Sequence, residues 1–326
     1  GAPDSGQYYW WLLEKGATLE NINWYINKRK TFNDHADMAA EFPSDDVEAF
    51  KHSGQRVFNQ YQVEELRKSC QKPEWTGELQ ADDVRGKKSL TNIKFIDSRN
   101  GDLKIWEMPD TSQRVVNRYL VVVDVGGRSK QADYSDIFVL DRYWMIYKGA
   151  PEVVAEWHGH IDHDLLAWKA AQVAKFYNEA LLVIESNTME TDNTDGDHTE
   201  YILDQISWEY TNLYARTDAD KIVEGKATRW GFHVNRFTKP MIINETVRVI
   251  REKAYVEREN DACDEYLQYE KKPNGSFGAV IGYHDDRLMA RCIALYICFN
   301  EMEAPKLSLK ENEMKPNTTV KSTMTL

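Results

Sequence analysis

The sequence lacks the features that would place it in a membrane or cross-link it covalently. No apolar run approaches the roughly 20 residues that a membrane-spanning helix needs, and no secretory signal opens the chain. The four cysteines show neither CxxC nor Cys/His spacing, so neither a zinc site nor a disulfide framework is expected. We therefore expect a protein that is neither secreted nor bound to a membrane, with free core thiols in a reducing compartment.

Basic residues are also in deficit. The chain has 41 lysines and arginines against 53 aspartates and glutamates, which gives a formal net charge of −12. A general nucleic-acid coat protein needs a basic surface, so this class is excluded. A nuclease is not excluded, because acidic metal ligands and a local basic groove can coexist with an acidic exterior.

A complete phosphate-binding loop is missing as well. The stretch Arg85-Gly86-Lys87-Lys88-Ser89 resembles the end of such a loop, but the first glycine of GxxxxGK[ST] and a leading strand are absent. We therefore expect residues 71–90 to form a solvated loop.

The N-terminal part has the pattern of a mostly helical linker region. Aromatic and apolar residues between Tyr8 and Ile26 recur at a rough spacing of three to four, which predicts helices. Residues 93–96 and 103–106 alternate around Asn100-Gly101, which predicts a β-hairpin. With a boundary in the loop that follows, residues 1–110 form the first predicted domain.

From Arg118 onward the pattern is that of an α/β fold. The β-branched run from Tyr119 to Asp124, followed by Gly126 and Gly127, predicts a buried central strand that ends at a carboxylate. Further strands are expected at 137–140, 153–157, 180–185 and 213–215, and helices at 162–178, 197–208, 240–258 and 284–299. A second hairpin is expected at 266–269 and 277–281.

These elements together predict the fold class. The first two strands are expected to form an antiparallel hairpin, and the strand at 180–185 to run parallel to the first through a right-handed crossover. The result is a mixed sheet flanked by helices over residues 111–304, followed by a polar, disordered tail at 305–326.

Acidic residues stand where ligands collect in such a sheet. Asp124 and Glu185 end two strands that we expect to be neighbours, and Asp285 and Asp286 begin a helix. Converging carboxylates repel one another unless they bind protons or divalent cations, and oxygen-only ligands favour Mg²⁺ or Mn²⁺. Two such ions about 4 Å apart can activate water and stabilise the leaving oxygen of a phosphodiester. Singly, however, each acid could merely cap a turn or a helix.

Several segments resemble the C-terminal nuclease domain of the large terminase subunit of tailed bacteriophages, an RNase H-like family. They are Val123-Asp124-Val125-Gly126-Gly127 with Asp133-Tyr134-Ser135, Val183-Ile184-Glu185-Ser186-Asn187, Trp230-Gly231-Phe232 with Thr238-Lys239-Pro240, and His284-Asp285-Asp286-Arg287-Leu288-Met289-Ala290. In addition, the segment from Glu41 to Phe50 resembles the end of the family's ATPase region.

The resemblance implies an RNase H-like mixed sheet and a role for each matching residue. Asp124 would bridge two Mg²⁺ or Mn²⁺ ions, and Glu185, Asp285 and Asp286 would complete the catalytic ligands. Asp133 would be an accessory acid. His284 would assist the metal-bound water or cap the helix.

It also implies the substrate and the setting. The substrate would be double-stranded phage DNA, with Arg229 and Lys239 either contacting phosphate or lying on the solvated surface. The cluster of basic residues that also contains Arg236 would suit a DNA-facing wall. The small terminase subunit and the portal protein would be partners, in the cytoplasm of the bacterial host.

The chain departs from the family pattern because no ATPase motif precedes this region. ATP-driven translocation is therefore not predicted for these residues. Two other functions stay open at this point. One is a different RNase H-like nuclease, such as a resolvase or an RNA–DNA hybrid nuclease. The other is a non-catalytic docking module of the packaging motor.

Overall fold

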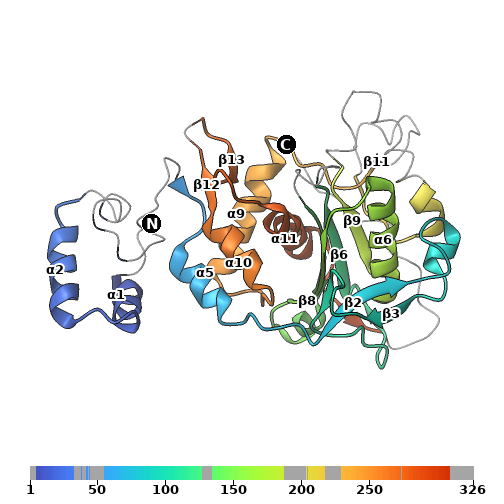
Figure 1. The fold of residues 1–326 in the computed structure, drawn as a ribbon, viewed down its shortest axis with the longest axis horizontal. Helices are drawn as coiled ribbons and strands as arrows, with labels where there is room; N and C mark the ends of the chain where they lie inside the picture. Colours follow the sequence, from blue (N-terminus) through green and yellow to red (C-terminus); the bar gives the residue numbers. More distant parts are fainter. Residues whose placement is uncertain are drawn as a thin grey trace.

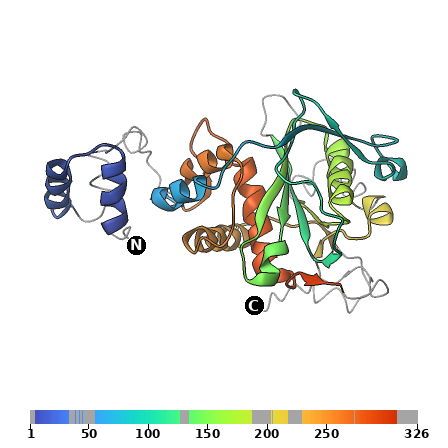
Figure 2. The same ribbon diagram turned by 90° about the horizontal axis from the view of Figure 1, so that it is seen from below.

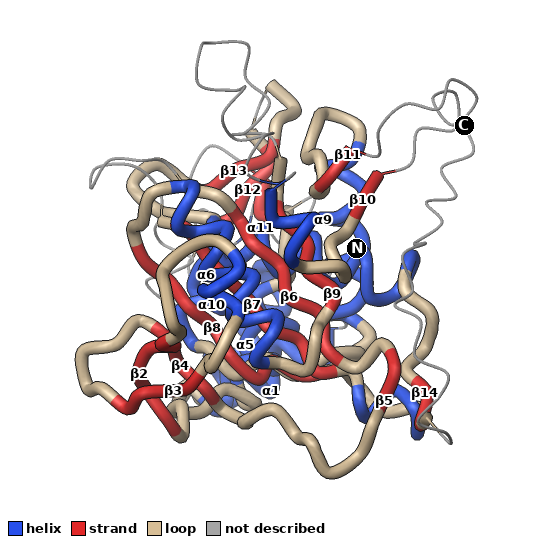
Figure 3. Tube along the Cα trace, turned by 90° about the vertical axis from the view of Figure 1, so that its right-hand side faces the viewer, coloured by secondary structure: helices blue, strands red, loops and turns tan. Residues whose placement is uncertain are grey.

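The centre of the molecule is a mixed sheet of seven strands in the order β3-β2-β4-β8-β7-β6-β9 (Figure 1). The computed structural model describes residues 5–32, 38, 42, 44, 55–126, 134–186, 203, 205–216, 229–272 and 274–308. The strands are β2 (Trp75–Gln80), β3 (Lys94–Asp97), β4 (Leu103–Ile105), β6 (Tyr119–Asp124), β7 (Ser135–Asp141), β8 (Glu152–Gly159) and β9 (Leu181–Ile184). Figure 3 shows β2, β3 and β4 towards one edge of the sheet and β9 at the other.

Strand β6 is fully buried between its neighbours, as the β-branched run predicts. It pairs antiparallel with β7, with Val123 opposite Ile137, and parallel with β9, with Val123 opposite Ile184. The predicted α/β fold class, a mixed sheet of antiparallel and parallel strands flanked by helices, is confirmed.

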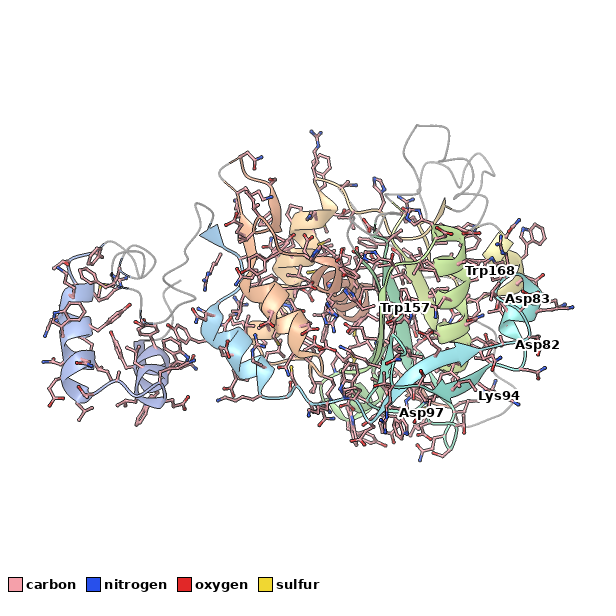
Figure 4. The ribbon with its side chains drawn as sticks, in the orientation of Figure 1. Asp82, Asp83, Lys94, Asp97, Trp157 and Trp168 are labelled. Carbon is pink, nitrogen blue, oxygen red and sulfur yellow. The ribbon has the colours of Figure 1, made fainter. Side chains whose placement is uncertain are left out.

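Helices cover both faces of the sheet. Because side chains alternate along a strand, Leu120 and Val122 of β6 pack with α9 (Thr238–Arg251) and α11 (Asp286–Tyr296), whereas Val121 and Val123 pack with α6 (His163–Phe176). Trp157 of β8 and Trp168 of α6 belong to the second of these clusters (Figure 4). The helices on the α9 side are therefore well placed to approach the end of β6.

Smaller elements surround this core. They are α1 (Ser5–Glu14), α2 (Leu19–Arg29), β1 (Gln55–Arg56), α5 (Gln60–Arg67), β5 (Val115–Val116), β10 (Ala215–Arg216), β11 (Arg229–Trp230), α10 (Asn260–Leu267), β12 (Tyr269–Lys271), β13 (Phe277–Ala279), β14 (Lys306–Leu307), the 3₁₀ turns η1 (Lys87–Leu90) and η2 (Tyr143–Tyr147), and the π-helical turn η4 (Ile297–Glu301). Helices α1 and α2 lie at one end of the molecule (Figure 2) and form an aromatic cluster with Tyr61 of α5. The prediction of helices in this N-terminal part is confirmed for α1, α2 and α5. Among the described residues, no helix is long and apolar enough to cross a membrane.

The predicted hairpin between residues 93–96 and 103–106 is wrong. Both strands exist as β3 and β4, but β2 lies between them and pairs with each. The turn signal at Asn100-Gly101 has a different cause, since a Cβ on Gly101 would lie 2.2 Å from the carbonyl oxygen of Gly77. Glycine is therefore needed there for a close approach to β2.

The prediction of a solvated loop over residues 71–90 is also wrong, because residues 75–80 form β2. Strand β2 carries mostly polar, half-exposed residues, so it shows no clear alternation. After it, the Asp82 carboxylate accepts hydrogen bonds from Thr91 Oγ1 and Asn92 Nδ2, both 2.8 Å long, which closes the connection to β3. Figure 4 shows Asp82 and Asp83 beside η1, with Lys94 and Asp97 at the two ends of β3.

Some predicted boundaries also move. The helix expected to reach Arg258 ends at Arg251, where Lys253 takes a left-handed φ of 54°. Residues 266–267 belong to α10, and the predicted second hairpin is built by β12 and β13. Strands on both sides of residue 110 share the seven-stranded sheet, and the proposed domain division there stays a prediction.

Other predictions fall on residues that the structure describes only in part. Most of the expected helix at 197–208, the residues after 308 and the segment 45–50 lie outside the described residues.

Candidate active site

Carboxylates from β6 and from the end of β9 meet at one edge of the sheet. Asp124 is the last residue of β6, and Glu185 directly follows β9. Because the two strands are parallel neighbours, their carboxyl ends coincide, and the Glu185 N–H donates to the Val123 carbonyl at 3.0 Å. The two side chains are within hydrogen-bonding reach of one another.

Negative charge on the carboxylates at this edge of the sheet is energetically unfavourable. Burial, followed by the charges of Glu185, Asp286 and Asp285, raises the pKa of Asp124 well above its ordinary value. Burial also raises the pKa of Glu185, although its interactions with the Asp124 side chain and the Val125 backbone and the nearby charge of Lys239 oppose that rise. The arrangement therefore favours a bound proton or cation over two bare carboxylates.

The acid pair at the start of α11 approaches the same edge. Asp286 is only 3% exposed, and its Oδ2 accepts the Tyr134 N–H at 3.2 Å and lies 3.8 Å from His284 Nδ1. Asp285 occupies the N-cap position, but its side chain makes no capping hydrogen bond. The alternative that Asp285 is merely a helix cap is therefore not supported by its geometry.

Glu265, a residue of α10, caps the N-terminus of the neighbouring helix α11. Its Oε2 accepts the Leu288 N–H at 2.8 Å, and its Oε1 lies 3.5 Å from Arg287 Nη1. Burial raises the pKa of Glu265 well above its ordinary value. A remote carboxyl thus provides the acceptor that N-cap side chains usually supply.

We expect Glu265→Ala to destabilise the protein by about 1–3 kcal/mol, because the buried Leu288 N–H loses its acceptor. Glu265→Gln keeps a carbonyl oxygen in place and should lose less than half of that. Urea unfolding of both variants measures the difference, with Glu252→Ala, at an exposed acid directly after α9, as control. If glutamine is as destabilising as alanine, the acceptor oxygen is not what Glu265 contributes.

Gly231 allows the chain to run close behind Glu185. The Phe232 N–H donates to the Ile184 carbonyl, and the Ser186 N–H donates to the Phe232 carbonyl, both at 2.8 Å. Gly231 itself has a φ of +83°, and a Cβ on it would lie 2.5 Å from the Ile184 carbonyl oxygen. The Trp230-Gly231-Phe232 motif therefore supports the backbone that carries Glu185.

A left-handed φ at a residue other than glycine costs about 1–3 kcal/mol. We expect Gly231→Ala to lower the free energy of unfolding by more than this amount. Gly275→Ala is the matched control, because Gly275 has a φ of +84° but open space around its Cβ position. The excess loss in chemical unfolding of Gly231→Ala over Gly275→Ala reports the clash with β9. Equal losses for the two variants would contradict the close approach.

The remaining predicted site residues lie at different distances from the carboxylates. Lys239 lies in the first turn of α9, near enough to Glu185 to affect its pKa, with Nζ 5.9 Å from the Tyr269 ring centroid. Arg236 is exposed and lies over the Phe237 ring. Arg229 is placed by its backbone in β11, opposite Arg216. Asp133 lies outside the described residues.

An aromatic cluster beside Asp286 was not predicted. The Tyr134 ring stacks on the rings of His160 and His158, with ring centroids 4.0 and 4.7 Å apart. It meets the His284 ring edge-on, with a centroid distance of 5.6 Å. The spacing of two between His158 and His160 was a weak signal, since alternate residues of a strand share one face. The cluster holds Tyr134, whose N–H contacts Asp286.

The donor set fits a hard divalent cation by its chemistry. Asp124, Glu185, Asp285 and Asp286 offer only carboxylate oxygens, which suit Mg²⁺ and Mn²⁺. In the part of the chain that the structure describes, no three acidic, histidine or cysteine side chains are already arranged as a metal site. The fit therefore rests on the identity and mutual repulsion of these oxygens.

Comparisons with known proteins identify similar folds. Neither a protein-family model nor a curated protein matches the sequence. Among solved structures, the magnesium-bound large terminase nuclease of thermophilic phage G20c is 12% identical, covers 74% of this chain and 96% of its own, and has a TM-score of 0.45. The P22 large terminase nuclease domain is 15% identical over 57% of this chain and 83% of its own, with a TM-score of 0.38.

The Mn-soaked human cytomegalovirus terminase nuclease domain is also similar. It is 11% identical, covers 59% of this chain and 87% of its own, and has a TM-score of 0.38. The chain is thus similar to terminase nuclease domains, but at these identities and TM-scores the likeness assigns neither a family nor an activity to it.

Proposed function

We propose that this chain is a metal-dependent endonuclease that cuts double-stranded phage DNA during genome packaging. The observation that carries the proposal is the meeting of Asp124 and Glu185 at one sheet edge, where Asp285 and Asp286 raise the pKa of Asp124 further. Folding concentrates negative charge there at a cost in stability. Such a cost is typical of sites whose function requires the charge.

Four carboxylates would hold the metal. Asp124, which the charges of the other three acids affect, would hold the Mg²⁺ or Mn²⁺ ions together with Glu185, Asp285 and Asp286. When bound, the ions supply an activated water and stabilise the leaving oxygen of the phosphodiester. Glu265 and the Tyr134 N–H would orient the acids of α11.

Cationic residues would position the DNA. Lys239 stands beside Glu185 and would contact a phosphate next to the scissile one, while Arg236 and Arg229 would contact the backbone further away. Asp133 would be an accessory acid. By the resemblance of the sequence, the small terminase subunit and the portal protein would be the partners, in the host cytoplasm.

The test is cleavage of supercoiled plasmid and of an RNA–DNA hybrid in Mn²⁺, Mg²⁺ or EDTA. We expect nicked and linear plasmid with either metal and intact plasmid in EDTA. Asp264→Asn, which changes an exposed acid of α10, should cut like the wild type. Cleavage of the hybrid alone would select the alternative of another RNase H-like nuclease. No cleavage by a folded protein would favour a non-catalytic docking module.

A further inference from the structure

A tight turn of four residues, Val280-Ile281-Gly282-Tyr283, leads directly into the acids of α11. The Tyr283 N–H donates to the Val280 carbonyl at 2.9 Å, and Gly282 has a φ of +88°, as the third residue of a type II turn requires. The Val280 N–H donates to the Gln268 carbonyl at 2.8 Å, which ties the turn to the chain just before β12. The turn is therefore closed by its own hydrogen bond and tied to the chain before β12 at its first residue.

Of the three side chains on this turn, Val280 is buried, whereas Ile281 and Tyr283 face solvent. Ile281, at the corner of the turn, is 95% exposed, and Tyr283 is 53% exposed. Corner positions of turns usually carry polar residues, proline or glycine. A rigidly displayed isoleucine gains nothing from this position in the folded chain alone.

The turn stands beside the proposed catalytic acids. Tyr283 is two residues before Asp285. Burial raises the pKa of Tyr269, the first residue of β12, and the nearby charges of Asp285 and Asp124 add to that rise. Anything that binds over the acids would therefore also meet the turn.

The charges around the turn indicate what this partner is. The small sheet β1-β12-β13 carries Arg56, Lys271 and the adjoining Lys272, and one buried acid, Glu270, opposite Arg56. Lys239 reaches the Tyr269 ring from α9. Basic side chains of this kind bind phosphates, and proteins that unstack a base step of duplex DNA combine such contacts with an exposed apolar side chain.

We propose that Ile281, with Tyr283 beside it, is a wedge that enters between two base pairs of bound duplex DNA and bends the strand towards the acids. This inference rests on the proposed nuclease function. The wedge opens the stack near the scissile phosphate, and the neighbouring cations hold the backbone on either side.

The experiment compares two DNA substrates that differ only in a short mismatched bubble at the cleavage position. Unstacking a step costs a few kcal/mol, so Ile281→Ala should lower nicking of the fully paired duplex about tenfold or more. On the bubble substrate, which is already unstacked, the same variant should lie within about twofold of the wild type. Ile281→Leu keeps an apolar side chain of equal size at this position, so this variant should nick the paired duplex like the wild type.

A binding measurement without cleavage accompanies it. With Ca²⁺ in place of Mg²⁺, wild type should raise the fluorescence of a 2-aminopurine placed at the bent step, and Ile281→Ala should not. Ile96→Ala, which changes an exposed isoleucine on β3, is the matched control and should behave like the wild type.

The outcomes separate the wedge from the nuclease. An equal loss on both substrates, or wild-type nicking and fluorescence with Ile281→Ala, overturns the wedge; the second result would leave a protein partner as the reason for the exposed turn. Fluorescence that depends on Ile281 without any cleavage by wild type supports the wedge and removes the proposed function.

Discussion

Asp124→Asn is expected to lower metal-dependent cleavage by about a thousandfold or more, because the metal ions that this ligand holds supply several kcal/mol of charge stabilisation in the transition state. The same variant should unfold at a higher temperature than the wild type in EDTA. Without metal, Asp124 is a buried acid beside Glu185, Asp285 and Asp286, and its ionisation is opposed by all of them. Asparagine removes that charge while keeping a similar shape.

The stability gain should depend on pH in a defined direction. Folding raises the pKa of Asp124, so the unfolded chain releases this proton near the ordinary value of 3.8 while the folded chain still holds it. Stability of the wild type therefore falls as pH rises from that value through the raised pKa. Asp124→Asn lacks this loss, so its advantage in EDTA should be small near pH 4 and largest above neutral pH.

Thermal unfolding of the two proteins across pH, with and without Mn²⁺, measures this. Each kcal/mol corresponds to about 2–4 °C in a domain of this size. With Mn²⁺ the wild type should unfold at the higher temperature, because the ion stabilises only the protein that binds it. Unchanged cleavage by Asp124→Asn, or equal stabilisation of both proteins by Mn²⁺, would remove Asp124 from the site. Asp264→Asn serves as the control for the loss of one acid.

Arg291→Met is expected to destabilise the protein by about 3–5 kcal/mol, since it leaves buried acids without a counter-charge. Arg291 is fully buried in α11. Its Nε lies 2.6 Å from Glu257 Oε2, its Nη2 2.9 Å from Glu156 Oε1, and its Nη1 3.6 Å from Asp136 Oδ2. Burial alone would raise the pKa of Glu156, but Arg291 and Arg287 outweigh it and lower that pKa to about 2.

The measurement is urea unfolding of Arg291→Met against Arg251→Met, which removes an exposed arginine of α9. The control should lose less than about 1 kcal/mol. Because methionine retains most of the buried apolar volume, a large loss reports charge rather than a cavity. A loss no larger than that of the control would show that the three acids take up protons and need no counter-ion.

The same arginine connects stability to the site. Arg291 lies five residues after Asp286 on α11, and its partners come from β7, β8 and the segment before α10. This network fixes α11 against the sheet, and with it the direction from which Asp286 approaches Asp124. Partial loss of the network should therefore reduce cleavage before it unfolds the protein.

Sequence patterns located the centre of the fold more securely than its edge. The β-branched run of β6 and the apolar stretch of β9 predict their strands because a strand buried on both faces must be apolar throughout. Strand β2 is half-exposed and polar, so its sequence resembles a loop, and its place between β3 and β4 depends on pairing with both. Pairing of this kind is a non-local property that no local spacing records.

The candidate site divides in the same way. The sequence by itself determined that acids end β6, follow β9 and begin α11, because strand ends and helix starts are visible in local periodicity. Only the tertiary structure decided that the Asp124 and Glu185 side chains meet, that Glu265 caps α11, and that Ile281 is exposed. These facts depend on contacts between residues more than 20 positions apart, or on what the rest of the fold leaves uncovered, and both are set by packing rather than by local pattern.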